Sequence, residues 1–261
     1  MHSEIIGIIP ARYASTRLPA KPLADIAGVP MVIRVWQNII SSKYLSRVII
    51  ATDDERILNK CAEYGAEAVM TPPELPSGTD RVFYTYNKIY NTINYNSSIN
   101  NTNKIIVNIQ GDEPLLTFNT IDNLLEKFIY SSADVGTIIT KISSFDELSS
   151  PDCVKVVLDN KNNAMYFSRS PIPYLRDQEI SNWHKLYTYW KHIGIYAYKI
   201  SALKKFVELE QSKYELLEKL EQLRLLETGA RFLCVEANET LISVDTPEDL
   251  ELVCNIIANN K

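Results

Sequence analysis

The sequence predicts an α/β fold built on a doubly wound, mostly parallel sheet. Four short apolar runs, each followed by a helical pattern, occupy the first half of the chain: EIIGII (4–9), RVIIATD (47–53), AEAVM (66–70) and KIIVNI (104–109). Strands that are apolar throughout are buried on both faces, as in a parallel sheet with helices on each side. Ligands of such folds bind beyond the carboxyl ends of the strands.

The intervening segments carry helix signals. A helix is expected from about Pro30, because proline suits the first helical turn. A second is expected near 54–64, with Gly65 to end it. The stretch SGTDRVFYTYNKIY (77–90) indicates a loop and a helix, and the polar, Asn-rich 91–103 indicates a surface loop rather than a domain boundary.

The pattern changes after about residue 134. VKVVLDNKNNAMYFS (154–168) predicts a hairpin of two strands around a polar turn. Residues 170–190 are rich in aromatic residues and proline without a clear period, which suggests a dimer or substrate surface. We expect one domain over 1–261, with an excursion from the core around 151–200.

Composition excludes several classes of function. A net charge of -5 and a pI near 5.4 argue against a general nucleic-acid binder. No apolar run approaches the length of a membrane span or a signal h-region, so we expect a cytoplasmic protein that does not contact membranes. The four scattered cysteines indicate buried thiols in a reducing compartment, and three histidines exclude a His-rich metal site.

Positive charge is concentrated in GIIPARYASTRLPAKPL (7–23), directly after the first predicted strand. Arg12, Arg17 and Lys21 lie there with little glycine, although a simple turn would favour Gly, Asn or Asp. The loop lacks the Walker A pattern. Guanidinium and ammonium groups nevertheless match the oxygens of a triphosphate. A solvated surface turn is the alternative.

Two aspartates are candidate metal ligands. Asp112 in NIQGDEP follows a strand at its carboxyl end and lies too early to cap the next helix, which begins near Thr117. In SVDTPEDL (243–250), Thr246 and Asp249 form a capping box, so Asp245 is not needed for the cap. Two carboxylates beside cations suggest Mg²⁺ bridging protein oxygens to phosphates. An ordinary turn aspartate remains the alternative for Asp112.

Further polar residues follow in the second half. KHIGIYAY (191–198) alternates like a strand and places His192 and Tyr196 on one face, where a ligand could approach or where the histidine is simply satisfied within the protein. SKYELLEKLEQLRLL (212–226) opens with a capping box, and its leucines 216, 217, 220 and 223 predict a core-facing stripe. Beside that stripe, a surface pair of Glu221 with Arg224 is the simpler explanation of the charges. Arg169 either meets a carboxylate or is solvated.

Eight segments together resemble one family, in this order: IIPARYASTRLPAKPL, SGTDR, NIQGDEP, VKVVLD, YFSRSPIP, HIGIYAY, LEKLEQLRLL and VDTPEDL. They are similar to the 3-deoxy-manno-octulosonate (Kdo) cytidylyltransferases, also called CMP-Kdo synthetases, from about residue 5 to 252. The resemblance implies a nucleotide-diphospho-sugar transferase-like fold and transfer of CMP from CTP to Kdo, with release of pyrophosphate. It also implies Mg²⁺ dependence, a homodimer and a role in lipopolysaccharide synthesis.

The resemblance also implies roles for individual residues. It implies that the triphosphate is bound by Arg12, Arg17 and Lys21. It also implies that the cytidine is surrounded by Ser77, Gly78, Arg81 and Gln110. Magnesium ligation falls to Asp112 and Asp245. The sugar site is formed by Arg169, His192, Tyr196, Glu221 and Gln222, with Arg169 as the partner of the Kdo carboxylate. Ala20, Leu75 and Ser243 depart from the family pattern, which commonly has Gly, His and Gly there.

Two other functions are compatible with parts of the pattern. A cytidylyltransferase for another acid sugar, such as a sialic acid, has a first loop resembling ARxGSKG, whereas this chain reads ARYASTRLPAK. A nucleotide-binding module without catalysis is the other alternative. The presence of both aspartates and all three cations argues against it.

Overall fold

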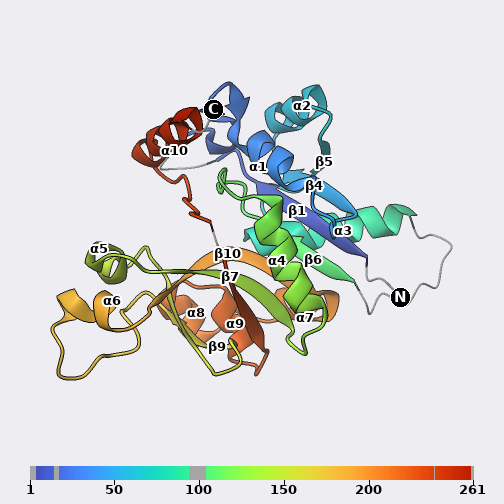
Figure 1. The fold of residues 1–261 in the computed structure, drawn as a ribbon. Helices are drawn as coiled ribbons and strands as arrows, with labels where there is room; N and C mark the ends of the chain where they lie inside the picture. The colour runs from blue at the N-terminus through green and yellow to red at the C-terminus, as the bar shows by residue number, and fades with distance from the viewer. Residues whose placement is uncertain (1–3, 15–17, 94–103, 238, 260–261) are drawn as a thin grey trace. The chain divides into compact units, whose positions relative to one another are not determined.

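The computed structural model describes residues 4–14, 18–93, 104–237 and 239–259 (Figure 1). Contacts group the chain into two compact units, one formed by 1–122 with 239–261 and the other by 123–238. The single-domain organisation expected from the sequence stays a prediction. Each unit is built around its own set of paired strands.

The first unit contains the predicted parallel strands. Their order is β6 (Ile105–Asn108), β1 (Ile5–Ala11), β4 (Arg47–Thr52) and β5 (Glu67–Met70), and every neighbouring pair is parallel. All four apolar runs are therefore confirmed as strands. Their carboxyl ends lie at one edge, where the basic loop, Asp53 and the NIQGDEP segment begin.

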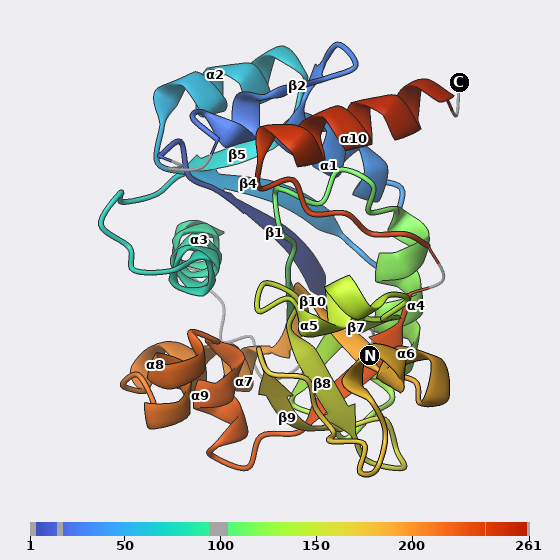
Figure 2. The same ribbon diagram turned by 90° about the vertical axis from the view of Figure 1, so that its left-hand side faces the viewer.

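Helices cover both faces of this parallel sheet. α3 (Gly78–Ile93) and α1 (Met31–Ile39) lie on opposite sides of β1 (Figure 2). A Cβ placed on Gly78 would lie 3.5 Å from Pro10, whereas one on Gly111 would lie 3.3 Å from Ile9 and 3.9 Å from Val32 of α1. Since successive residues of a strand face opposite sides, the doubly wound arrangement is confirmed for this unit.

Helix ends agree with the sequence signals. Asp54 caps α2 (Glu55–Glu63) by accepting the Arg56 N–H, and Gly65 follows the helix with a positive φ. α4 (Phe118–Ile129) and α10 (Pro247–Asn259) begin where expected. A short hairpin, β2 (Asp25–Ile26) and β3 (Val29–Pro30), follows the 3₁₀ turn η1 (Lys21–Leu23). Of the expected loop 91–103, residues up to Ile93 belong to α3 and the rest lie outside the described residues.

The second unit has mixed pairing. Its strands run in the order β11 (Phe232–Glu236), β7 (Val135–Lys141), β10 (Trp190–Lys199), β8 (Lys155–Leu158) and β9 (Ala164–Ser168). Only β11 and β7 pair in parallel. The predicted hairpin is confirmed as β8 and β9. Two helices, α5 (Phe145–Ser149) and α7 (Ile200–Glu208), follow β7 and β10.

The excursion at 170–190 packs into a small core that it shares with residues 142–153. It contains the 3₁₀ turn η3 (Ile180–Asn182) and α6 (Trp183–Leu186). Trp183 and Tyr189 are buried together with Ile142, Leu148 and Cys153. Tyr174, Leu186 and Tyr187 remain exposed. Whether this segment forms a dimer surface or a substrate surface is not tested, so that role stays a prediction.

The segment 212–226 is two helices rather than one. α8 (Lys213–Glu218) has the predicted Ser212–Glu215 capping box, and Lys219 then adopts a left-handed conformation at φ 55° before α9 (Gln222–Leu226). This break changes which leucines face inward. Leu220 and Leu223 are buried as expected, but Leu216 and Leu217 are exposed, so their assignment to the core is wrong.

The cysteines match the composition argument, because all four are free and three are buried. Burial raises the pKa of the Cys61 thiol to about 11, as expected for an unreactive thiol in an apolar site. Among the helices of the described ranges, none is long and apolar enough to cross a bilayer.

The backbone conformation of Ala20 predicts that glycine at this position stabilises the fold. Its backbone is left-handed at φ 54°, directly before Lys21. Such a backbone costs an alanine about 1–2 kcal/mol, and glycine adds about 0.4–1 kcal/mol of freedom to the unfolded chain. Ala20→Gly should therefore raise the free energy of unfolding by roughly 0.5–1 kcal/mol, measured by urea denaturation. Ala24→Gly is the matched control, since φ there is -56°, and it should destabilise. Equal losses from both variants would contradict the strain at Ala20.

Candidate active site

A cavity of ≈ 390 Å³ opens at the carboxyl edge of the parallel strands in the first unit. Six residues singled out from the sequence line it: Arg12, Lys21, Gly78, Gln110, Asp112 and Asp245. They come from four separate stretches of the chain, and the structure brings them together as expected. Arg17 lies outside the described residues.

Lys21 joins the two candidate metal ligands. Its Nζ donates to Asp112 Oδ2 at 2.6 Å and to Asp245 Oδ1 at 2.8 Å. The lysine side chain is only 15% exposed. Burial alone would lower the pKa of Lys21, but the two carboxylates outweigh it and raise the pKa above its ordinary value. The group at this point is therefore a fully charged ammonium.

Backbone contacts hold the two carboxylates near each other. Val244 N–H donates to the Asp112 carbonyl at 2.9 Å, which ties the segment before α10 to the loop after β6. A Cβ at Gly111 would lie 3.2 Å from the Pro10 carbonyl, so glycine lets this loop approach the end of β1. The predicted capping box is present, because Asp249 accepts the Thr246 N–H at 2.9 Å and Thr246 Oγ1 accepts the Asp249 N–H at 3.2 Å.

The donor set around Lys21 fits a magnesium ion. Two carboxylate oxygens already lie around one cation, and Mg²⁺ is commonly held by one or two carboxylates with substrate phosphates and water completing its shell. Within the described ranges, no three His, Cys, Asp or Glu side chains form a metal-binding group. The aspartate pair is thus the candidate site, with the lysine ammonium as the stand-in cation.

Asp53, at the end of β4, organises the basic loop and was missed by the sequence analysis. It accepts the Tyr13 N–H at 3.1 Å and the Arg81 Nη2–H at 3.1 Å, and its carboxylate lies 4.0 Å from Arg12 Nε. The signal was available in ATDD, because Asp54 alone caps α2 and Asp53 is left for another purpose. The same elimination had found Asp245.

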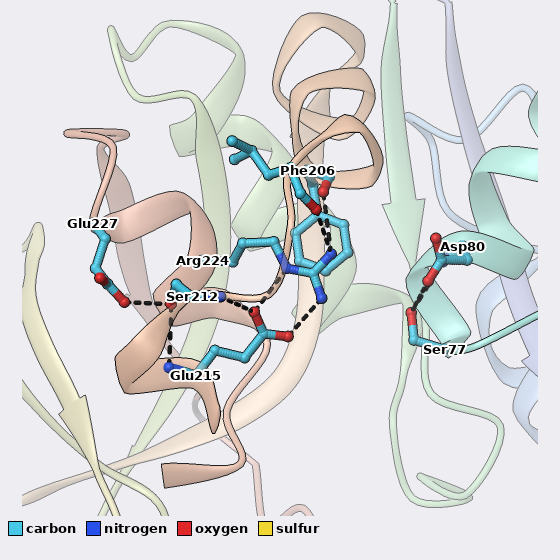
Figure 3. A network of polar contacts seen from close by, with 8 residues as sticks. Ser77, Asp80, Phe206, Ser212, Glu215, Arg224 and Glu227 are labelled. Atoms are coloured by element: carbon cyan, nitrogen blue, oxygen red, sulfur yellow. Dashed lines mark hydrogen bonds and ion pairs between the residues drawn. The ribbon is translucent and has the colours of Figure 1, made fainter. Parts of the chain in front are cut away.

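The predicted cytidine residues have structural roles in this unit. Arg81 is fully buried and bonds Asp53 and the Thr71 hydroxyl, and burial lowers its pKa although Asp53 opposes the shift. Ser77 Oγ donates to Asp80 Oδ2 at 2.6 Å at the start of α3 (Figure 3). Arg12, 43% exposed, donates to the Leu75 carbonyl at 2.8 Å. The positions of Ser77 and Arg81 near the cytidine stay predictions, as does the contact of Arg12 with the triphosphate.

In the second unit, His192 and Tyr196 are neighbours on β10, with ring centroids 5.4 Å apart. Thr137 Oγ1 lies 2.8 Å from the Ile195 carbonyl, to which it donates, and 3.0 Å from His192 Nε2. When the hydroxyl donates to this carbonyl, the imidazole donates to Thr137 Oγ1 from Nε2. Burial lowers the pKa of His192 to about 3, so the ring is neutral at physiological pH. Burial also raises the pKa of Tyr196, with Tyr198 and Glu221 adding to the effect.

Arg169 at the end of β9 is fixed by backbone carbonyls. Its Nε donates to the Glu218 carbonyl and its Nη1 to the Pro151 carbonyl, each at 2.7 Å. The Pro151 loop is also held by Lys155, a fully buried lysine that the sequence analysis missed, whose Nζ donates to the Ser150 and Cys153 carbonyls. Arg169 is thus a positioned guanidinium rather than a freely solvated one.

Glu221 and Gln222 stand at the start of α9, which packs against β9. Gln222 is buried, and its Nε2 has no hydrogen-bond partner within the described residues, which is uncommon for a buried amide. α9 is anchored by Arg224, whose Nε and Nη2 reach Glu215 of α8 at 2.8 and 2.5 Å (Figure 3). Both partners are buried, so the expected surface location of Arg224 is wrong.

The buried Glu215–Arg224 pair predicts that substitution of either residue causes a large, pH-dependent loss of folding stability. Arg224→Met leaves a buried carboxylate unpaired and should lower the free energy of unfolding by roughly 3–5 kcal/mol, measured by urea denaturation with tryptophan fluorescence. Burial alone would raise the pKa of Glu215, but hydrogen bonds from Arg224 and Ser212 lower it. A carboxyl with a lowered folded pKa stabilises the fold above its unfolded pKa. The contribution should therefore vanish as pH falls through the lowered value.

The control for this substitution is Lys204→Met, which breaks the exposed Lys204–Glu208 pair of α7. Its effect should be small, because exposed pairs contribute little. A similar small loss from Arg224→Met would show that the buried pair does not anchor α9.

Comparisons with known proteins place the chain in a family. A model of the cytidylyltransferase family matches residues 6–233. The chain is 43% identical over 254 residues to the 3-deoxy-manno-octulosonate cytidylyltransferase of Porphyromonas gingivalis, covering 96% of this chain and 95% of that one. It is 42% identical over 260 residues to the protein of that name from Parabacteroides distasonis, covering 98% and 99%.

Comparison with solved structures supports the same family. A CMP:2-keto-3-deoxy-manno-octonic acid synthetase complexed with CTP matches with a TM-score of 0.86 and 36% identity, covering 99% of this chain and all of that one. A 4-diphosphocytidyl-2C-methyl-D-erythritol synthase from Anaerococcus prevotii, at 12% identity, TM-score 0.59 and coverage of 99% and 100%, shares the fold alone. The chain belongs to the cytidylyltransferase family, and within it to the 3-deoxy-manno-octulosonate cytidylyltransferases.

Proposed function

We propose that the protein transfers CMP from CTP to Kdo, giving CMP-Kdo and pyrophosphate, with Mg²⁺ as the metal. The observation that carries the proposal is the cavity in which Arg12, Lys21, Asp112 and Asp245 come together, in a chain of this family. Two cations and two carboxylates in one cavity suit a magnesium triphosphate better than a neutral ligand.

The reaction needs positioning and charge neutralisation more than a covalent protein nucleophile. The anomeric hydroxyl oxygen of Kdo forms a bond to the α-phosphorus while the bond to the pyrophosphate oxygen breaks, and the hydroxyl proton is released. Arg12 and Lys21 bind the triphosphate and neutralise the leaving pyrophosphate. When bound, Mg²⁺ held by Asp112 and Asp245 supplies positive charge at the α-phosphate.

Recognition of the sugar is assigned to Arg169, His192, Tyr196, Glu221 and Gln222. Arg169 is the natural partner of the Kdo carboxylate, since its guanidinium is oriented by backbone carbonyls. The neutral ring of His192 recognises a hydroxyl by hydrogen bonding rather than by charge. The buried amide of Gln222 offers a donor that a sugar oxygen would satisfy.

The remaining nucleotide contacts are assigned as follows: Arg17 binds the triphosphate, and the surroundings of the cytidine are formed by Ser77, Gly78, Arg81 and Gln110. Arg81 acts through its contact with Asp53.

We also propose that the protein is a cytoplasmic homodimer acting in lipopolysaccharide synthesis. The exposed Leu216, Leu217 and Leu186 support a subunit contact, and the free cysteines support a reducing compartment. Sedimentation velocity distinguishes a dimer from a monomer.

The deciding experiment measures pyrophosphate release from purified protein with CTP, Mg²⁺ and Kdo, with N-acetylneuraminate as the parallel substrate and EDTA as a control. Release only with Kdo and only with metal is expected. Release with the sialic acid alone would overturn the sugar assignment. No release with either would favour a nucleotide-binding module.

The metal assignment predicts the effect of Asp112→Asn. This substitution should cut turnover by orders of magnitude while the thermal unfolding profile stays close to that of the wild type, because Asp112 faces the cavity. Glu248→Gln removes the same charge from an exposed position in the first turn of α10 and should leave turnover unchanged. Near-normal turnover of Asp112→Asn would exclude Asp112 as a metal ligand.

The contacts of Asp53 predict that its substitution lowers catalytic efficiency by disturbing the basic loop. Asp53→Asn removes the charge that holds Arg81 and lies near Arg12, so kcat/KM for CTP should fall roughly 10–100-fold, mainly through KM. Asp54→Asn is the matched control, because asparagine also caps helices and kcat/KM should hardly change. Equal kinetics of the two variants would show that Asp53 does not position the loop.

A further inference from the structure

Lys21 Nζ contacts one carboxylate oxygen of Asp112 and one of Asp245, and a metal bound to these two oxygens would lie close to the same point. Its nitrogen lies 2.6 Å from Asp112 Oδ2 and 2.8 Å from Asp245 Oδ1. A magnesium ion bound to the same oxygens requires distances of about 2.0–2.1 Å. Ammonium and metal therefore cannot both occupy this point, and at close range the two cations repel each other.

The three groups are not brought together by chance side-chain rotation. Lys21 N–H donates to the Leu18 carbonyl at 3.1 Å, immediately after the left-handed Ala20. Asp112 is tied to Val244 through the backbone, and Asp245 N–H donates to Asp249 Oδ2 at 3.0 Å. The backbones on both sides of the ion pairs are thus fixed, and exchange of the cation requires only movement of the lysine side chain.

A triphosphate offers Lys21 another partner. The ammonium lines the same cavity as Arg12 and Gln110. Its three donors match phosphate oxygens as well as they match carboxylates. Once the ammonium pairs with phosphate, the contacts of Lys21 with Asp112 and Asp245 are lost, and the affinity of these carboxylates for another cation rises.

We propose that Lys21 sets the order of binding: its ammonium excludes Mg²⁺ from Asp112 and Asp245 until a triphosphate draws it away. The proposal rests on the metal assignment made above and adds that the free protein binds Mg²⁺ weakly. By linkage, nucleotide and metal then raise each other's affinity by the same factor. Couplings of this kind are typically about 5–150-fold.

The test titrates Mg²⁺ alone into nucleotide-free protein by calorimetry. Lys21→Met should bind Mg²⁺ at least about tenfold more tightly than the wild type, because no ammonium competes. Lys21→Arg keeps a cation near the carboxylates and should resemble the wild type. Lys43→Met is the matched control, since it removes an exposed lysine of the same unit.

Thermal unfolding supplies a readout that needs no activity. Without metal, Lys21→Met leaves two neighbouring carboxylates without their ammonium and should melt below the wild type. Millimolar Mg²⁺ should restore its melting temperature while leaving that of the nucleotide-free wild type unchanged. Adding Asp112→Asn to Lys21→Met should abolish the response to Mg²⁺.

The outcomes separate this proposal from the function proposed above. If wild type and Lys21→Met respond equally to Mg²⁺ alone, and Asp112→Asn abolishes both responses, the metal assignment stands and the ordering role of Lys21 is overturned. If Asp112→Asn changes Mg²⁺ affinity in neither background, with or without CTP, the metal assignment itself fails and the ordering role fails with it.

Discussion

The site in the first unit depends on the meeting of one ammonium with two carboxylates from distant parts of the chain. Lys21, Asp112 and Asp245 can meet because β1 and β6 are parallel neighbours, so that the loops after them leave from the same edge. The segment before α10 joins them through a backbone hydrogen bond to Asp112. The two carboxylates are only partly exposed, and a cation between them offsets their mutual repulsion; the fold supplies that cation from its own chain.

The two units handle charge in different ways. In the first, Arg12 and Lys21 line a cavity, and the ammonium of Lys21 is paired with two carboxylates rather than with backbone carbonyls. In the second, Arg169 and Lys155 are engaged by backbone carbonyls, and His192 is kept neutral by burial. Triphosphate binding benefits from mobile charge, whereas discrimination between similar sugars benefits from donors and acceptors held in fixed directions. The contrast is consistent with the proposed division of binding, with the triphosphate in the first unit and the sugar in the second.

Sequence patterns predicted the four parallel strands of the first unit, the β8–β9 hairpin and β10, and also the convergence of Lys21, Asp112 and Asp245, because parallel strands and helix caps leave strong local signals. They did not predict β7 or β11. Asp245 was found by noticing that Thr246 and Asp249 complete the cap without it. Asp53 could have been identified from ATDD by the same reasoning, since Asp54 alone caps α2, but its partners Tyr13 and Arg81 are distant in the sequence. Lys155 was missed because its partners are backbone carbonyls, which no side-chain pattern encodes. The single stripe over 212–226 failed for a related reason: the left-handed Lys219 is set by tertiary packing, and the capping box before it gives no sign of a break.

The contact between Arg12 and Leu75 has a consequence for variation within the family. Arg12 donates to the carbonyl oxygen of Leu75, not to its side chain. A bond of this kind survives any exchange of side chain that leaves the backbone path unchanged. Leucine at this position, in place of the histidine that the family resemblance implies, therefore does not by itself alter how the guanidinium is held. A change of side chain at such a place is therefore a poor guide to a change in chemistry.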